Sequence, residues 1–299
     1  MEERLLGKTK QPVSLIGFGA LEVGRTWGLG SPQDTERPNE QDATTLLHHV
    51  LDCGITLIDT AAAYHASEAR IGQALTHRRA EYFLASKCGE HNREPGTYYD
   101  FSEEAIRTSI DESLIRLQTS QIDLMQIHFG PDPTRVLREG FTVKAMRDAR
   151  EKGLVRFLGA SCEPDIVPAI ISLQDFDAIQ LTYNLLDRQA EDAIKRAADN
   201  ELGVMIRFPL AMGFLTPKRH AISQDSPKAQ WAAQYLQIAH NDDALLIALA
   251  LQFIARMPEV SSILVGTKNP LHLDTAIQAL TVPLPSGMLD EAIRLKATV

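Results

Sequence analysis

Hydrophobic positions along the chain follow two patterns that alternate: short apolar runs, and apolar residues at helical spacing. Short, almost continuously apolar runs, such as those at 82–88 and 122–128, indicate buried strands. Between such runs apolar residues recur at helical spacing, as at Ile106, Ile110 and Leu114, which is typical of a helix packed on a sheet. The predicted strands are 14–20, 55–60, 82–88, 122–128, 156–162, 177–184, 204–211 and 261–267. The predicted helices are 41–52, 67–75, 102–118, 143–152, 164–173, 190–200, 244–256 and 270–280.

Strands that alternate with helices predict a parallel sheet with right-handed crossovers. Eight strand-then-helix units in 299 residues fit an α/β fold of the closed (β/α)8 TIM-barrel type best. A hairpin is expected within residues 4–20 and an extra helix after Gly287. No linker rich in Pro, Gly or Ser divides the chain, so residues 1–299 are predicted to form one domain. Long connections at 89–101, 129–142 and about 212–225 all follow strands, which places them at the carboxyl-end face of the barrel.

Charge and cysteine content narrow the classes of partner. The formal net charge of −9 argues against a general nucleic-acid binder and, weakly, against an anionic membrane surface. Cys53, Cys88 and Cys162 are far apart, so neither a disulfide framework nor a zinc knuckle is indicated, and no metal is predicted. There is no signal-like N-terminus and no uninterrupted apolar stretch of about 18 residues. A cytoplasmic protein that acts on a small molecule is expected, and its oligomeric state is left open.

Ionisable side chains stand at the ends of three neighbouring predicted strands. Asp59 ends ITLID, Lys87 lies at the end of YFLASKC, and His128 ends IDLMQIH. Alternate residues of a strand share a face, so all three are expected to point into the barrel. Tyr64 follows in the loop after Asp59, where Ser67 is expected to cap the next helix and Glu68 to be a favourable acid in its first turn.

These four residue types suit the reduction of a carbonyl group. A phenol has a reference pKa of about 10, and a neighbouring cation such as Lys87 lowers it by about 1–3 units. Asp59 would hold Lys87 in place, and His128 would donate a hydrogen bond that orients the carbonyl oxygen. None of these groups supplies a hydride, so a nicotinamide cofactor is required.

The segments that carry these residues resemble those of the aldo-keto reductases. IDTAAAYHASEARIGQAL is similar to that family's signature of an aspartate, a loop tyrosine and a following S-E, and LASKCG and LMQIH resemble its lysine and histidine strands. The resemblance implies that Tyr64 is the general acid/base, that Lys87 and Asp59 tune it, and that His128 orients the substrate. His65 stands where the family commonly has glycine.

The same resemblance implies a cofactor stretched across the barrel mouth, and no G-x-G-x-x-G opens a helix here. The cofactor-binding positions that it implies are Ser161, Cys162, Gln180, Arg207, Leu210, Gly213, Leu215, Gly266, Thr267, Lys268 and His272. Ser161 and Gln180 match the residues that hold the nicotinamide carboxamide. Cys162 replaces a common asparagine, and Arg207 replaces an aromatic residue that often stacks on the nicotinamide.

The phosphate-binding segments also match the family, with departures. Residues 209–218 resemble the loop that grips the pyrophosphate, and 265–276 resemble the segment that binds the adenosine 2′-phosphate at a helix N-terminus. Thr267 and Lys268 favour NADPH/NADP⁺ as the cofactor. His272, Thr275 and Ala276 depart from the family's adenine contacts, so NADH stays open.

The sequence leaves the substrate unnamed. Aromatic residues on loops of the catalytic face are candidate pocket walls: Trp27, Tyr98, Tyr99, Phe101 and Phe129. The predicted activity is hydride transfer between NADP(H) and an aldehyde, ketone or sugar, as reduction or as alcohol oxidation. The main alternative is a non-catalytic, cofactor-binding regulatory subunit like the potassium-channel β subunits. A metallohydrolase that uses Asp59, Lys87 and His128 is a third, disfavoured because no H-x-H pair is present.

Overall fold

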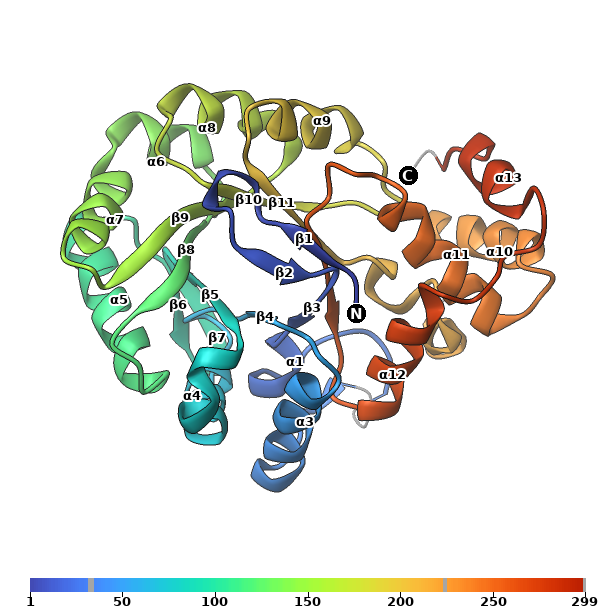
Figure 1. The fold of residues 1–299 in the computed structure, drawn as a ribbon, viewed down its shortest axis with the longest axis horizontal. Coiled ribbons are helices and arrows are strands. Elements are labelled where there is room, and N and C mark those ends of the chain that lie inside the picture. The colour runs from blue at the N-terminus through green and yellow to red at the C-terminus, as the bar shows by residue number, and fades with distance from the viewer. Residues whose placement is uncertain (32–34, 223–224, 298–299) are drawn as a thin grey trace.

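A closed barrel of eight parallel strands forms the centre of the molecule. The computed structural model describes residues 1–31, 35–222 and 225–297. Neighbouring strands follow the order β10, β11, β12, β3, β4, β5, β8, β9 around the barrel (Figure 1). Their bounds are β3 Ile16–Gly19, β4 Leu57–Asp59, β5 Phe83–Cys88, β8 Ile122–His128, β9 Val155–Ser161, β10 Ala178–Thr182, β11 Gly203–Arg207 and β12 Ser262–Gly266. The predicted (β/α)8 barrel is confirmed.

Helices surround the barrel, and several begin at side chains that cap them. Asn39, Ser102 and Asp242 accept backbone N–H groups at the starts of α3, α5 and α11, which satisfies donors that a helix leaves unpaired. The ring consists of α3 Glu40–Asp52, α4 Ser67–Leu75, α5 Glu103–Arg116, α7 Phe141–Glu151, α8 Val167–Leu173, α9 Glu191–Asp199, α11 Asp243–Ala255 and α12 Pro270–Ala279. Further helices are α1 Leu21–Gly24, α6 Pro133–Glu139, α10 Pro227–Ile238 and α13 Met288–Arg294, with 3-10 turns at Gly7–Thr9, Thr76–Glu81, Pro164–Ile166, Ala211–Gly213 and Pro217–Ala221.

The N-terminal hairpin closes the amino end of the barrel. β1 (Glu3–Leu5) pairs antiparallel with β2 (Pro12–Ser14), and the pair lies across the barrel opening (Figure 1). Leu6 and Val13 are fully buried there and join an inner apolar layer. That layer also contains Leu57, Phe83, Leu124, Met205 and Leu264 from five different strands. A barrel filled in this way has a solid floor.

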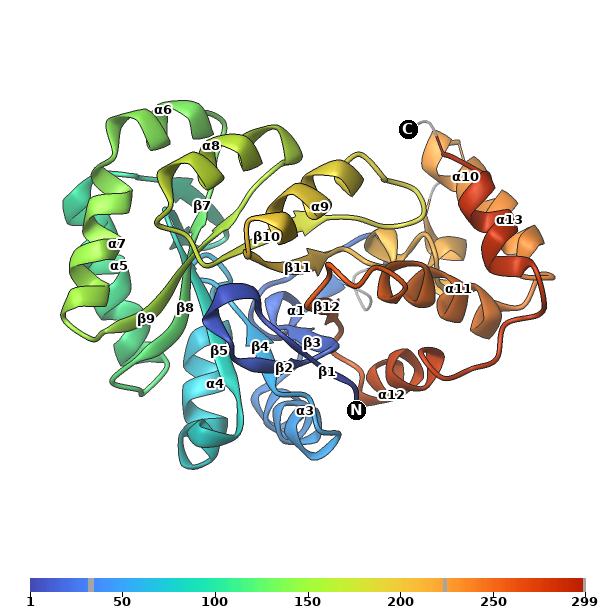
Figure 2. The same ribbon diagram turned by 45° about the horizontal axis from the view of Figure 1, so that its top comes forward.

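Two features lie outside the eight predicted strand-then-helix units, although α13 is the extra helix expected after Gly287. β6 (Glu90–Arg93) and β7 (Gly96–Tyr99) form an antiparallel hairpin in the connection after β5. α10 and α13 run side by side at the outer edge beside α11 (Figure 2). Among the residues that the structure describes, no single helix is long and apolar enough to cross a membrane, and only the pair α10 and α11, bent by 102°, reaches that length and composition together.

The start of α4 differs from its prediction. Ala66, not Ser67, is the N-cap residue. The Ser67 hydroxyl instead donates to Ala20 O at 2.8 Å and contacts the Thr60 hydroxyl at 2.9 Å, which fastens the helix to β3 and β4. Glu68 lies in the first turn as predicted but is fully buried, where it accepts hydrogen bonds from Ser86 and Arg116. The S-E pair therefore locks α4 onto the strands.

Candidate active site

An ion pair between Asp59 and Lys87 occupies the barrel above the apolar layer. Lys87 Nζ donates to Asp59 Oδ2 at 2.5 Å and to Thr60 O at 2.9 Å. The Lys87 side chain has no exposed surface and that of Asp59 only 5%. Burial alone would lower the pKa of Lys87, but the attraction of Asp59 and Tyr64 outweighs it and raises that pKa, so the ammonium stays charged.

Two amides complete the coordination of Asp59. Gln126 and Gln180 each donate their Nε2 to Asp59 Oδ1, at 2.8 and 2.9 Å. Because Lys87 occupies the other oxygen, both carboxylate oxygens are engaged. Asp59 therefore acts as a support for Lys87. This arrangement disfavours the metallohydrolase alternative, because that alternative needs the Asp59 carboxylate to be free to bind a metal ion.

Tyr64 reaches this ion pair from the loop between β4 and α4. The centre of its ring lies 4.8 Å from Lys87 Nζ and 6.0 Å from the centre of the His128 ring. Gly24 of α1 makes the approach of this loop possible, because a Cβ atom there would lie 2.1 Å from Ser67 N and 2.2 Å from Tyr64 O. His65 has a φ of 49°, a left-handed conformation that suits the glycine common at this position in the family.

The pKa of Tyr64 moves in the opposite direction to that predicted. Burial raises it above its ordinary value of 10.0, and the nearby charge of Lys87 offsets only part of that rise. Desolvation of a phenolate inside the barrel outweighs the attraction of one cation that Asp59 already partly neutralises. Tyr64 thus keeps its proton at neutral pH, which suits a proton donor.

His128, at the end of β8, contacts a carboxylate on the hairpin. Its Nδ1 lies 2.8 Å from Glu90 Oε2, and both side chains are largely buried. Burial lowers the pKa of His128 below 6.5, Lys87 and Arg207 lower it further, and Glu90 raises it only in part. His128 is therefore mainly neutral at neutral pH.

One cavity of about 650 Å³ joins this cluster to the predicted cofactor segments. Asp59, Tyr64 and His128 line it, and Lys87 lies behind them. The predicted cofactor residues that line it are Ser161, Gln180, Arg207, Leu210, Gly213, Gly266, Thr267, Lys268 and His272. Within the described part of the chain, Cys162 and Leu215 are buried beside this wall without lining it, and burial raises the pKa of the Cys162 thiol to about 12.

Some of the predicted substrate-pocket residues line the cavity and others do not. Trp27 lines the cavity. Tyr98, Tyr99 and Phe129 do not line it in the described structure. Tyr98 stacks on His91 with 5.1 Å between the ring centres, and Tyr99 stacks on Phe101 with 6.0 Å between them. The two tyrosines therefore help to order the β6–β7 hairpin and the residues that follow it.

Arg207 is a fixed charge in the cavity wall. Its guanidinium donates to Ser161 Oγ and Thr182 Oγ1, each at 2.9 Å, and to Glu163 Oε1 at 2.5 Å. Ser161 in turn donates to Gln180 Oε1 at 3.2 Å. The predicted carboxamide-binding residues and Arg207 thus form one connected set in the wall of the cavity that Tyr64 also lines.

The far end of the cavity carries positive charge that suits the phosphate groups of a dinucleotide. Lys218, Lys268 and Asn269, the N-cap residue of α12, line it there, and cations at a helix N-terminus form a site for anions. Glu22 lines the cavity as well, and its burial raises its pKa although the charges of Lys218 and Lys268 oppose the rise. A volume of about 650 Å³ is in the range of cofactor pockets.

Three residues of the site were given no role from the sequence: Gln126, Glu90 and Glu22. Strand alternation predicts that Gln126 faces into the barrel with His128, and its hydrogen bond to Asp59 confirms that direction. Glu90 comes two residues after the strand, where a hairpin that the pattern does not reveal turns it back toward His128. Nothing in the sequence pattern marks Glu22.

Comparison with known proteins agrees with this geometry. The model of the Aldo/keto reductase family matches residues 15–294. L-galactose dehydrogenase of Arabidopsis thaliana is 30% identical, with 98% of this chain and 92% of that protein covered. The NADH-specific methylglyoxal reductase of Escherichia coli is 26% identical, with 95% of each covered. The holo form of aldo-keto reductase AKR11C1 from Bacillus halodurans superposes with a TM-score of 0.83 at 27% identity, over 100% of this chain and 98% of that one. The chain belongs to the aldo/keto reductase family and is an NAD(P)H-dependent oxidoreductase.

Proposed function

We propose that this protein transfers hydride reversibly between NADP(H) and the carbonyl or alcohol group of an aldehyde, ketone or sugar, with Tyr64 as the general acid/base. The observation that carries the proposal is the single cavity that runs from Tyr64 and His128 to Lys218 and Lys268. A nicotinamide cofactor bound there supplies or accepts the hydride.

The residues of the chain then have separate tasks. In reduction, Tyr64 holds a proton next to the site where negative charge develops on the carbonyl oxygen, and its raised pKa keeps that proton in place until it is needed. Lys87 stabilises the tyrosinate that remains, because its buried ammonium lies beside the ring. Asp59, held by Gln126 and Gln180, keeps Lys87 in position.

The cofactor preference rests on the charges at the far end of the cavity. Lys218 and Lys268 both line it there, and each can pair with the 2′-phosphate that distinguishes NADPH from NADH. NADPH is therefore the proposed cofactor, although one relative carries the name of an NADH-specific enzyme.

Tyr64→Phe tests the acid/base assignment. We expect wild-type protein to oxidise NADPH with a reactive aldehyde from a substrate panel, and Tyr64→Phe to lose about a hundredfold or more in kcat. Its NADPH affinity, measured by fluorescence titration, should stay near wild type because the hydroxyl is the only group removed. Tyr98→Phe, which changes a tyrosine outside the cavity, is the matched control.

Two outcomes would contradict the proposal. A Tyr64→Phe protein that turns over normally would remove Tyr64 from the chemistry. Tight NADPH binding by the wild type, with no turnover on any carbonyl compound, would favour the non-catalytic regulatory subunit instead.

A further inference from the structure

A cluster of a histidine, a cysteine and an aspartate lies on the outside of the barrel. His49 and Cys53 are four residues apart at the end of α3 and therefore share one face of that helix. Asp274 belongs to α12, which packs beside α3 (Figure 1). In the described ranges of the chain, no other three His, Cys, Asp or Glu side chains come close enough to share a metal ion.

The distances inside this cluster are close to those of a metal centre. Cys53 Sγ lies 3.3 Å from His49 Nε2 and 3.6 Å from Asp274 Oδ1, and the latter two atoms are 2.7 Å apart. Around tetrahedral Zn²⁺, with bonds of about 2.0–2.3 Å, ligand atoms are separated by about 3.4–3.6 Å. Two of the three separations thus fit already, and the third must widen by roughly 0.7 Å.

The side chains that must move have the freedom to do so. The side chains of His49 and Asp274 are 32% and 35% exposed. Small rotations of these two side chains open the gap between them without disturbing the barrel. The same exposure leaves a path for an ion and for a water molecule as an additional ligand.

The surroundings of the cluster favour a cation. Cys53 is the C-cap residue of α3, and the carboxyl end of a helix carries partial negative charge. Burial and the carboxylates of Asp274 and Asp52 raise the pKa of the Cys53 thiol, so the thiol keeps its proton at neutral pH. A bound cation displaces that proton to solvent and offsets the repulsion between the thiolate and the carboxylates.

The types of donor atom select the class of metal. Thiolate sulfur and imidazole nitrogen suit Zn²⁺, which also accepts a carboxylate oxygen. Mg²⁺ and Ca²⁺ prefer ligand sets made of oxygen alone. Three protein ligands leave one tetrahedral position, which water can occupy.

We propose that His49, Cys53 and Asp274 bind one Zn²⁺ ion, which ties α3 to α12. The site goes beyond the proposed function, since hydride transfer in the cavity does not require it. It also differs from the sequence-based expectation of no metal. That expectation rested on local spacing, and Asp274 lies 221 residues from Cys53 in the chain.

Titration of reduced, untagged protein with Zn²⁺ tests the site directly. Isothermal calorimetry should show one strong site per chain, with no comparable site for Mg²⁺. His49→Asn, Cys53→Ser and Asp274→Asn should each raise the Kd for Zn²⁺ about tenfold or more, since even the loss of a group that supports a ligand costs 10–100-fold. His48→Asn is the matched control, because its ring lies beside His77 on the same outer surface and its loss should leave the Kd unchanged.

Co²⁺ reports which atoms bind. Co²⁺ added to the wild type should produce the ultraviolet absorption of thiolate-to-metal charge transfer, which Cys53→Ser should abolish and His48→Asn should retain. Circular dichroism of each variant without metal shows whether the fold is retained, so that a lost ligand is distinguished from a lost structure.

Thermal unfolding measures the link between the two helices. Zn²⁺ at about 100 times its Kd should raise the melting temperature of the wild type by about 5 °C and that of Cys53→Ser by much less. Wild-type protein that binds no Zn²⁺, or binding that the three substitutions leave unchanged, overturns the proposal. Binding that His48→Asn weakens as much as Cys53→Ser does also overturns it, because the ion would then lie elsewhere on the surface.

Discussion

At the scale of single residues, the proposed preference for NADPH depends on the charge at the far end of the cavity. His272 lines this end, but burial and Lys218 lower its pKa, so it is neutral at neutral pH. Glu22 lines the same end of the cavity, where burial raises its pKa and the charges of Lys218 and Lys268 oppose that rise. In the proposed NADPH complex, Lys218 and Lys268 are the cations of this end of the cavity that would pair with the 2′-phosphate.

Lys268→Met should separate the two dinucleotides. Loss of one charged hydrogen bond to phosphate should raise the Kd for NADPH about tenfold or more. The Kd for NADH should change by less than about twofold, because NADH has no group for this lysine to bind. Fluorescence titration with both dinucleotides measures this, with the exposed Lys10→Met as control. An equal loss of affinity for NADPH and for NADH would show that Lys268 does not bind the 2′-phosphate.

The sequence predicted the four central residues because three of them end strands whose alternation fixes their direction. Asp59, Lys87 and His128 need only the strand register to meet. The pKa of Tyr64 could not be predicted in this way, since it depends on how fully the ring is desolvated. The contact of Glu90 with His128 depends on a hairpin whose polar sequence, EHNREPGTYY, shows no apolar alternation.

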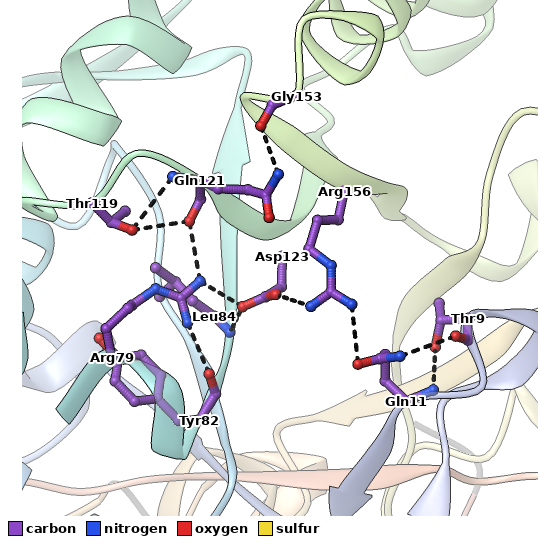
Figure 3. Close-up of polar contacts among 10 residues, drawn as sticks. All are labelled: Thr9, Gln11, Arg79, Tyr82, Leu84, Thr119, Gln121, Asp123, Gly153 and Arg156. Carbon is purple, nitrogen blue, oxygen red and sulfur yellow. Dashed lines mark hydrogen bonds and ion pairs between the residues drawn. The ribbon is translucent and has the colours of Figure 1, made fainter.

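At the scale of elements, one buried acid joins the amino ends of several strands. Asp123, near the start of β8, accepts from Arg79 at 2.6 Å, from Arg156 of β9 at 2.5 Å and from Leu84 N of β5 at 2.9 Å (Figure 3). Arg156 continues to Gln11 between β1 and β2. This network links the barrel wall to the hairpin that closes it.

Asp123→Asn should destabilise the fold and leave the chemistry intact. Removal of the charge leaves two guanidinium groups without their anion, which should cost about 2–3 kcal/mol in the free energy of unfolding. NADPH affinity should not change, since five residues of strand, about 16 Å, separate Asp123 from His128.

Urea denaturation measures this cost. Asp52→Asn, which removes a 62% exposed partner of Arg78, should lose less than about 1 kcal/mol. Similar decreases in the free energy of unfolding in both variants would mean that the Asp123 network stabilises the fold no more than a surface ion pair does.

The elements that escaped prediction share a physical cause. β6, β7 and α6 lie in connections that follow strands, and no apolar period in the sequence marks them. α10 contains Trp231 and Leu236, but its apolar residues are spread around the helix because it packs beside both α11 and α13. The barrel strands, by contrast, are buried on both sides and so read as apolar runs.

At the scale of the whole molecule, the cofactor should be part of the stability of the barrel. The cavity is lined by β3, β4, β8, β9, β10, β11 and β12 and by the start of α12, so a ligand there contacts elements from both ends of the chain. Ligand binding to the folded state alone stabilises it by mass action.

NADPH should therefore raise the melting temperature. At about 100 times its Kd it adds about 2.7 kcal/mol, which for a chain of this length corresponds to a rise of about 5 °C. NADH at the same concentration should raise it less. Thermal unfolding followed by circular dichroism tests both, and Lys268→Met should bring the two shifts together. Equal shifts in the wild type would contradict the preference for NADPH.

The floor formed by the N-terminal hairpin determines the route by which the cofactor and substrate can enter and leave the barrel. Leu6 and Val13 are fully buried against the inner apolar layer, so nothing passes along the barrel axis. Cofactor and substrate must enter and leave by the opening at the carboxyl ends of the strands. A reactant that lies beneath the other in this closed-ended cavity must arrive first and depart last, so the closed floor links depth of binding to order of binding.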